Sequence, residues 1–471
     1  MVVTPYALIV FLVGMILLVR GSLLAMFSAF LIATMFNGSA AFILVAAGGS
    51  SIPPAQFMLG FLALRLVLPG PGQMQRLSGA IWESRYLVLF VSYAVISAVL
   101  LPIVFARMMD VTPLKPIPGA DLFATVPLRM TPQNLTTAFY MVGTLFAGIA
   151  ATAAMERPGA GQRLVKVGSA ITLAHALLGI SSVVLAGTAW DSLLGLFRNG
   201  NYAQLNQSFS GIVRMSGIFP EASGYAAYGA IWCVFMLELW FRDVAPRRTG
   251  FAGLVLLLAL LASTSSTAYV STGAYALFVF IRFLLGPLVM PVRKQLALIA
   301  AALIGATFVL GALVFVPDVA TKAGNILQLM TTDKLESGSG IQRSFWAKQG
   351  LSAFMNSYGI GIGAGSFRSS SVATAILGSM GVIGVVTFLA HLFKSVRPFS
   401  GEFLSLRAED RGGAVGSAAA TTALLMLVPQ AVASPSPDPG ILWGVMCGVA
   451  IAMRPRRITQ PDGAWTRSAV A

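Results

Sequence analysis

Long apolar segments, separated by short polar connections, make up most of the chain. A helix that crosses the hydrocarbon core of a bilayer needs about 20 mostly apolar residues. Candidates for such helices are 5–19, 22–47, 55–69, 86–106, 134–155, 167–187, 223–241, 251–265, 267–290, 296–316, 373–393, 413–433 and 440–453. The long segment 22–47 is interrupted at Asn37 to Ser39 and can hold more than one element. The pattern predicts an all-α, polytopic integral membrane protein, a single membrane domain over 1–471 with about 12 to 14 helices.

The composition supports this class of protein. Hydrophobic residues make up 57% of the chain and charged residues only 10%, and the mean hydropathy is +0.83. Soluble proteins carry about 25% charged residues, so this chain cannot present an ordinary wetted surface. The net charge of +15 would favour nucleic acid in a soluble protein, but cytoplasmic loops of membrane proteins collect Lys and Arg. We therefore expect the lipid bilayer, and no nucleic acid, as a partner.

The basic residues also predict an orientation. Clusters of Lys and Arg fall on alternate connections, near residues 76–85, 157–166, 242–248, 293–294, 394–411 and 454–457. The positive-inside rule places these connections in the cytoplasm. The connections 107–133, 188–222, 317–372 and 434–439 then face outward.

The outward connections nevertheless carry many cations, where topology alone would leave few. These are Arg107, Lys115, Arg129, Arg198, Arg214, Lys322, Lys334, Arg343, Lys348 and Arg368. Either they keep the loops soluble, or they bind an anionic ligand on the outer face.

The large loop 317–372 is the main interruption of the apolar pattern. Its first half is polar, and its middle interleaves aromatic and aliphatic residues with Arg343 and Lys348. A helix there would be amphipathic and lie in the membrane interface. Binding of lipid head groups is therefore one interpretation of its cations, and binding of a substrate is the other.

The end of this loop is rich in glycine. Gly359, Gly361, Gly363 and Gly365 alternate with other residues, and Arg368 follows. Such a run lets the backbone approach a ligand, with N–H groups free to hold an anion, and Arg suits phosphate. A loose turn before the next helix is the alternative.

A shorter outer segment brings Arg214 and Glu221 together around Pro220. Glu221 precedes a predicted helix, where a carboxylate is favoured by the helix dipole, so capping explains it simply. The functional alternative is a general base at the membrane boundary, with Arg214 orienting it or binding phosphate. A hydroxyl cluster at Thr264 to Thr272 either satisfies backbone groups or contacts substrate.

The sequence predicts no metal and no cofactor. Cys233 and Cys447 lie in apolar spans, as does His175, while His391 lies near the inner end of another span. We expect His175 to hydrogen-bond between helices. No phosphate-binding nucleotide motif and no ligand spacing for a metal is present.

Three motifs in a fixed order resemble a known family. They are Arg-x5-Pro-Glu-x-Ser over 214–223, Thr-x-Ser over 264–266, and a large loop with Ser-Gly-Ser-Gly-x2-Arg-x-Phe-Trp over 337–346 and Gly-Ile-Gly-Ala-Gly-Ser-Phe over 361–367. In this order they are similar to the O-antigen ligase and O-antigen polymerase superfamily of bacterial envelope enzymes. The motifs cover roughly 200–375.

The resemblance implies a metal-independent glycosyltransferase of the GT-C type, in the bacterial inner membrane with a periplasmic active face. Its donor would be a glycan on undecaprenyl pyrophosphate, with a chain-length regulator and a flippase of the same pathway as candidate partners. The family's outer arginines bind pyrophosphate, which maps onto Arg214, Arg343 and Arg368, and we add Lys348, Gly363 and Gly365 as candidate contacts.

The chain departs from the ligases at one point. They carry a histidine in the large outer loop near the glycine motif, where this chain has Asn356 and Ser357. We therefore expect a polymerase of O-antigen or exopolysaccharide repeat units, with Glu221 as candidate base. A ligase, or a polysaccharide transporter or flippase, is the alternative. A transporter should show charged residues in mid-span and related halves, and the sequence shows few such charges and one large loop.

Overall fold

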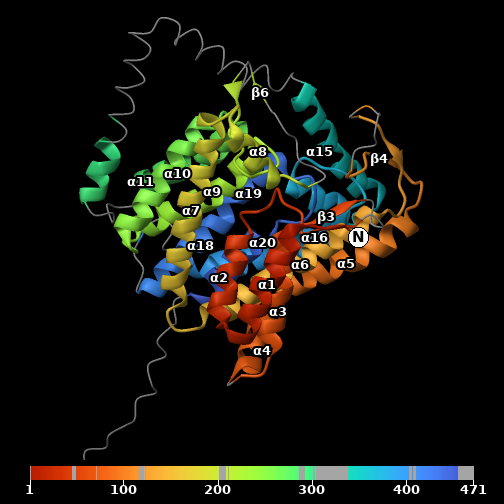
Figure 1. Ribbon diagram of the computed structural model, residues 1–471. Coiled ribbons are helices and arrows are strands. Elements are labelled where there is room, and N and C mark those ends of the chain that lie inside the picture. Colours follow the sequence, from red (N-terminus) through yellow and green to blue (C-terminus); the bar gives the residue numbers. More distant parts are fainter. Residues whose placement is uncertain are drawn as a thin grey trace, which may run out of the picture.

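The computed structural model describes residues 2–44, 49–70, 72–115, 121, 123–200, 208–209, 212–285, 292–300, 303, 338–401, 406 and 410–454. Within these ranges the chain is a bundle of helices with three small antiparallel sheets (Figure 1). The predicted all-α architecture is therefore confirmed in its main feature.

The amino-terminal part of the bundle contains eight helices of the described chain. They are α1 (Pro5–Arg20), α2 (Leu23–Ala33), α3 (Pro54–Val67), α4 (Gln73–Glu83), α5 (Arg85–Val104), α6 (Pro132–Met155), α7 (Ala160–Val184) and α8 (Ala189–Leu196). Small strands lie in its connections: β1 (Val2–Val3), β2 (Phe42–Leu44), β3 (Ser50–Ile52), β4 (Asp110–Val111) and β5 (Val126–Pro127). The order in the first sheet is β1-β2-β3, and β4 pairs with β5.

The carboxy-terminal part contains the second group of helices. They are α9 (Ala222–Phe241), α10 (Pro246–Ala262), α11 (Ser266–Leu285), α15 (Gly338–Asn356), α16 (Val372–Val396), α18 (Arg411–Leu425), α19 (Leu427–Ala433) and α20 (Ile441–Ala452). The strands β6 (Ser208–Phe209) and β7 (Ile212–Val213) form a hairpin before α9, and a short 3-10 helix, η2 (Arg397–Phe399), follows α16.

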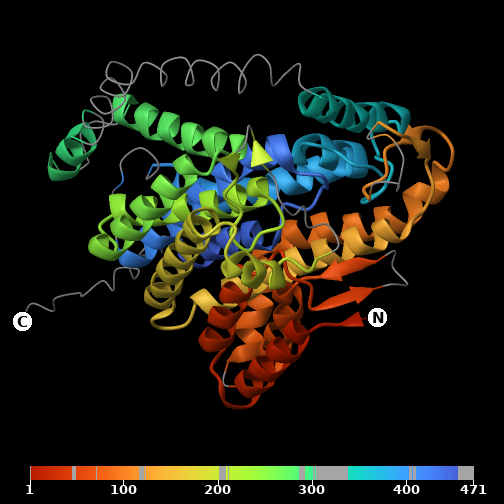
Figure 2. The same cartoon turned by 45° about the horizontal axis from the view of Figure 1, so that its top comes forward.

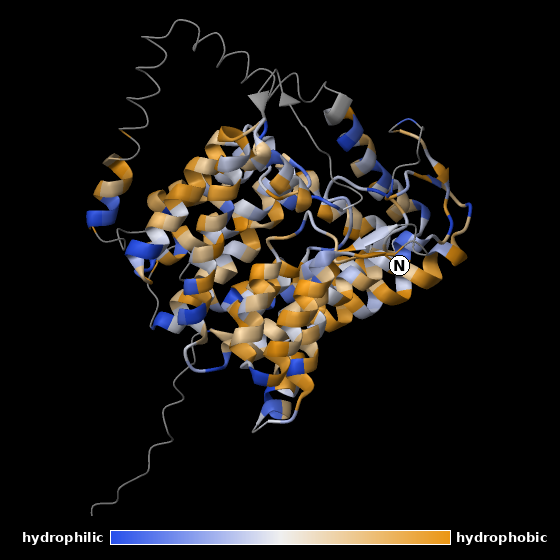
Figure 3. Ribbon diagram, viewed as in Figure 1, coloured by the Kyte–Doolittle hydropathy of each residue, from blue (hydrophilic) through white to orange (hydrophobic). Residues whose placement is uncertain are grey.

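Seven segments of the described chain are helical, long and apolar enough to cross a membrane. They are Arg85–Val104, Pro132–Met155, Ala160–Val184, Ala222–Phe241, Ser266–Leu284, Val372–Phe399 and Arg411–Ala433. Hydrophobic residues dominate these helices (Figure 3). The chain therefore has the architecture of a polytopic membrane protein. The apolar helices α1, α2, α3 and α20 are shorter.

The predicted spans mostly coincide with helices, and the segment 22–47 holds more than one element, as its interruption indicated. The segment 22–47 is helical only as far as Ala33, and its end forms β2, which pairs with β3. In the connection between α2 and β2, Gly38 packs tightly: a Cβ there would lie 2.4 Å from the Ile218 carbonyl oxygen. Most of the predicted span 296–316 lies outside the described residues, as do Lys322 and Lys334 of the large loop.

Small residues allow the central helices α6 and α20 to approach closely. A Cβ on Gly444 would lie 2.5 Å from the carbonyl oxygen of Thr144, and one on Gly448 would lie 2.4 Å from that of Gly148. Glycine is favoured at such helix interfaces because packing, and not hydrophobic transfer, holds helices together in lipid. This contact lets the short helix α20 lie buried at the centre of the bundle (Figure 1).

The two sets of connections separate to opposite ends of the bundle. At one end the N–H of Ser369 donates to the carbonyl of Pro435, at 3.0 Å, and Phe123 packs against Phe345. At the other end Glu83 forms ion pairs with Lys394 and Arg454. Both α5 and α16 run from one group to the other, so the connections expected outside meet on one end (Figure 2).

Candidate functional site

The segment before α9 forms a braced turn that positions Arg214 and Glu221. The guanidinium of Arg198 donates to the carbonyl oxygen of Gly217, with Nε 2.9 Å away. The N–H of Gly217 donates to Ser182 Oγ at 3.2 Å, and its φ of +53° is a conformation that favours glycine. Arg198, one of the outward cations expected from sequence, therefore has a structural role in holding this turn.

Glu221 is the first residue outside α9, at its N-cap. Its side chain makes no capping hydrogen bond to the backbone and instead accepts one from Ser223 Oγ. The position is still favourable for a negative charge because the helix dipole is positive there. Glu221 is partly buried and lies within electrostatic range of Arg214 and Arg368.

Arg214 interacts electrostatically with Glu221 and Arg343. Burial lowers the pKa of Arg214, while the Glu221 carboxylate raises it and the Arg343 guanidinium lowers it further. Charges that shift each other's pKa lie within electrostatic reach. The turn before α9 and helix α15 of the large loop are therefore brought together at this end of the bundle.

Arg343 lies near the start of α15, and the loop after that helix contacts it. Ser370 Oγ donates to the carbonyl oxygen of Arg343 at 2.7 Å. The guanidinium of Arg368 lies over the ring of Trp346, with its Cζ 4.5 Å from the ring centroid. The stack fixes Arg368 beside α15, as expected for a guanidinium on an aromatic face.

Arg368 completes the cluster. One of its terminal nitrogens donates to the carbonyl of Leu114 at 3.2 Å, and Nε is buried with no hydrogen-bond partner among the described residues. Burial lowers its pKa and Glu221 raises it. The structure thus gathers Arg214, Glu221, Arg343 and Arg368, which we call the arginine cluster. A buried guanidinium N–H without a partner can bind an anion.

Lys348 lies apart from this cluster. Its side chain is exposed on a face of α15 that also carries Ile341, Leu351 and Met355, all more than half exposed. An exposed apolar face with a cation fits the membrane interface. Polar and apolar residues are only weakly segregated around α15, so the expected amphipathic pattern is not pronounced. For Lys348 the exposed position favours the lipid head-group alternative over a contact with the arginine cluster.

The glycine run packs against helices, which differs from the expected open anion site. The N–H of Gly363 donates to the Ser379 carbonyl at 2.9 Å, and that of Gly361 donates to Ser357 Oγ at 2.8 Å. A Cβ on Gly363 would lie 2.7 Å from the Ser97 carbonyl oxygen, and one on Gly365 would lie 2.5 Å from that of Gln133. The glycines serve close contact with α5, α6 and α16, and this packing positions Arg368.

Sequence reasoning missed the residues that anchor the loop. Gln349 of α15 makes two hydrogen bonds to Thr112, at 3.0 Å to its N–H and 3.1 Å to its hydroxyl. Asn134 at the start of α6 donates to the carbonyl of Ala364 at 2.8 Å and to Ser366 Oγ at 2.9 Å. The partners in each hydrogen bond are far apart in sequence. A polar residue by itself does not indicate which distant residue it will contact.

The other polar residues singled out from sequence have structural contacts. His175 forms a hydrogen bond of 3.1 Å with the carbonyl of Tyr225 and stacks on its ring, which confirms the expected helix-to-helix bond. Ser271 and Thr272 donate back to the carbonyls of Thr267 and Ala268, which favours backbone satisfaction for the hydroxyl cluster. Among the described residues no group of His, Cys, Asp and Glu is arranged to hold a metal.

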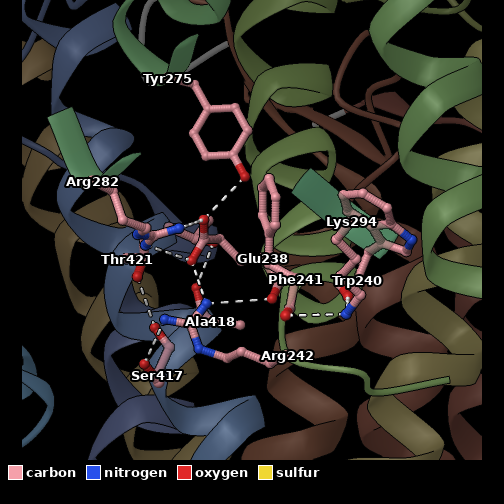
Figure 4. A network of polar contacts seen from close by, with 11 residues as sticks. Glu238, Trp240, Phe241, Arg242, Tyr275, Arg282, Lys294, Ser417, Ala418 and Thr421 are labelled. Atoms are coloured by element: carbon pink, nitrogen blue, oxygen red, sulfur yellow. Dashed lines mark hydrogen bonds and ion pairs between the residues drawn. The ribbon is translucent and has the colours of Figure 1, made fainter. Parts of the chain in front are cut away.

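A second charged network lies within the bundle, near the far end of α9 (Figure 4). Glu238 is fully buried and accepts hydrogen bonds from Arg242, Arg282 and Tyr275. Ser417 of α18 accepts one from Arg242 at 2.8 Å. The charges of α9 and α11 pair with one another, as buried charges in a membrane protein must, and the Ser417 hydroxyl links them to α18. The network holds helices together and is separate from the arginine cluster.

The chain was also compared with known proteins. No protein-family model matches it, and neither a curated protein nor a solved structure does.

Proposed function

We propose that this chain is a glycosyltransferase that polymerises oligosaccharide repeat units carried on undecaprenyl pyrophosphate. One observation carries the proposal: the arginine cluster gathers three guanidinium groups and one carboxylate from segments that are far apart in sequence. The cluster lies at the end of the bundle where the positive-inside rule leaves little reason for cations. A membrane-bound diphosphate is the kind of ligand that such a site suits.

The reaction assigns a role to each charge. A hydroxyl of the acceptor sugar attacks the anomeric carbon of the donor, and the bond from that carbon to the pyrophosphate oxygen breaks. Negative charge develops on the leaving pyrophosphate, where Arg214, Arg343 and Arg368 would stabilise it. Glu221 would accept the proton of the attacking hydroxyl as general base. The arginines supply the positive charge, and the energy comes from the glycosyl phosphate bond.

The acceptor separates the main proposal from its closest alternative. A polymerase transfers the growing glycan to another lipid-linked repeat unit, whereas a ligase transfers it to a different acceptor such as lipid A core. The large outer loop lacks a histidine where the ligases carry one, which supports the polymerase. A transporter would use the cluster only to recruit substrate.

Analysis of lipid-linked sugars in a deletion strain tests the proposal. We expect single repeat units to accumulate on undecaprenyl pyrophosphate, measured by mass spectrometry of extracted lipid. Accumulation of lipid-linked polymer would point to the ligase. Retention of repeat units on the cytoplasmic side would point to a flippase, and unchanged lipids and polysaccharide would contradict all three functions.

Variants of the cluster then test the site. Arg214→Ala and Arg343→Ala should each stop polymer formation while the protein remains in the membrane. Arg129→Ala is the matched control, because Arg129 is an exposed cation on the same end of the bundle. Long polymer in both cluster variants, or equal loss in the control, would remove the pyrophosphate assignment.

A further inference from the structure

A cationic pocket lies at the end of the bundle opposite the arginine cluster. It is a cavity of about 370 Å³ where α5 begins and where α16 and α20 end. Four cationic side chains line it: Arg85, Lys394, Arg397 and Arg454. The lining also includes the rings of Tyr86 and Phe393. The positive-inside rule accounts for cations at this end of the bundle, and the packing of three elements brings four of them to one cavity.

The described contacts balance only part of this charge. Glu83 pairs with Lys394 at 2.9 Å and with Arg454 at 3.0 Å. Arg85 instead lies over the rings of Trp82 and Tyr86, 5.1 and 4.9 Å from their centroids. The guanidinium of Arg397 lies 5.5 Å from the centroid of Phe393. The contacts described here give one carboxylate to four cations, so the pocket suits an anion.

The surroundings of the pocket are those of a membrane interface. Helix α16 carries an exposed apolar stripe at helical spacing, made of Val382, Val386, Leu389 and Phe393. In a membrane helix such a stripe faces the acyl chains of lipids. The stripe ends at the pocket, and Trp82 beside it is 68% exposed, as expected for an aromatic residue at the head-group level.

We propose that the cationic pocket binds the phosphate of an anionic phospholipid whose acyl chains lie along α16. Arg and Lys side chains bind phosphate groups, and basic pockets between transmembrane helices are suited to lipid head groups. A soluble phosphate compound would use the same cations but not the apolar stripe. The pocket is remote from the arginine cluster, so this proposal is independent of the glycosyltransferase activity.

Lipid binding to the purified full-length protein tests the proposal. Native mass spectrometry would count bound phosphatidylglycerol and phosphatidylcholine offered at equal concentration, with inorganic phosphate as competitor. We expect phosphatidylglycerol to be retained in preference, and inorganic phosphate at equal concentration to leave it bound. Equal retention of the two lipids would overturn the proposal, and displacement by phosphate alone would assign the pocket to a soluble anion instead.

Variants assign the binding to the pocket. Arg85→Gln and Arg397→Gln are chosen because neither side chain forms an ion pair among the described residues. Each should weaken phosphatidylglycerol binding about fivefold, the effect of one cation near a membrane surface. Arg85→Lys and Arg397→Lys should retain most of the binding, which separates loss of charge from misfolding.

The control removes equal charge elsewhere on the same end. Arg247 and Arg248 are exposed at the start of α10 and do not line the pocket. The Arg247→Gln and Arg248→Gln variants should bind phosphatidylglycerol as the parent does. Equal weakening in these variants and in the pocket variants would show a diffuse surface effect and overturn the assignment. If a Gln variant in the pocket unfolds at a lower temperature than the parent, lipid binding of the matched Lys variant tests the assignment in its place.

Discussion

Arg282 donates hydrogen bonds from both terminal nitrogens to Glu238, at 2.9 Å to Oε1 and 3.0 Å to Oε2 (Figure 4). The pair lies inside the protein and joins α11 to α9. Both side chains are nearly inaccessible to solvent. The planar guanidinium matches the two carboxylate oxygens, so the pair fixes the rotation of one helix relative to the other. Arg242, the residue that follows the last residue of α9, pairs with the same carboxylate, which therefore lies between two cations.

Glu238→Gln should destabilise the protein strongly, because it removes the negative charge that pairs with the two buried guanidinium groups of Arg242 and Arg282. Removing one partner of a buried ion pair costs about 3–5 kcal/mol. Thermal unfolding in detergent measures the loss. Tyr275→Phe is the control: it removes one hydrogen bond of 3.0 Å to the same carboxylate and should cost about 1.5–3 kcal/mol. Equal melting temperatures for Glu238→Gln and the parent would show that the network contributes nothing to stability.

Gly363→Ala should disrupt the loop that carries Arg368. Its φ is +100°, and the added Cβ would lie 2.7 Å from both the Ser97 carbonyl oxygen and Pro102 Cδ. Backbone strain and collision together predict a loss of at least about 1–3 kcal/mol, measured by thermal unfolding. Gly60→Ala is the matched control, because Gly60 lies within α3 with no atom within 4 Å of the new Cβ. That variant should gain about 0.5–1 kcal/mol. A melting temperature of Gly363→Ala at or above that of the parent would refute the packing role of the glycine run.

Arg368→Lys should reduce the proposed transfer although it keeps the charge. Lysine lacks the planar group that stacks on Trp346 and the Nε that lies buried without a partner in the described structure. Loss of one preorganised donor to a developing anion costs about 10²–10³ in kcat. Polymer formed per unit of membrane-inserted protein is the measurement.

Lys348→Ala serves as the comparison for Arg368→Lys. Lys348 lies on the exposed face of α15, so its removal should leave polymer formation within about twofold of the parent. If Lys348→Ala lost as much activity as Arg368→Lys, the two side chains would have to act on the same ligand, contrary to the geometry described here.

Asp438 should make stability depend on pH. The residue lies in the connection between α19 and α20, where burial raises the pKa of its carboxyl while hydrogen bonds from Thr144 and Gly440 lower it. The folded state therefore holds the proton more tightly than the unfolded state. Its contribution to stability is present at low pH and is lost as pH rises through the folded pKa. Asp438→Asn cannot titrate, so its melting temperature should rise relative to the parent between about pH 4 and pH 7. A constant difference across that range would contradict the raised pKa.

The sequence alone determined the class of the protein and most of its helices. Unbroken apolar segments can satisfy their backbone groups in lipid only as helices, so predicted spans such as 134–155 and 373–393 coincide with α6 and α16. The interruption at Asn37 to Ser39 indicated that 22–47 holds more than one element, but the sequence did not show that its end forms a strand. The connection after α2 packs closely against a distant segment, because Gly38 contacts the backbone of Ile218, a residue far away in sequence.

Only the tertiary structure decided which polar residues share a site. Sequence singled out Arg214, Glu221, Arg343 and Arg368, but their proximity depends on how α9, α15 and the glycine run pack. It also grouped Lys348 with them, although Lys348 lies on the other face of its helix. The hydrophobic pattern that predicts a membrane helix is a local property of consecutive residues, so it can be recognised in the sequence. The meeting of charges depends on contacts between distant segments, and those exist only once the helices have packed.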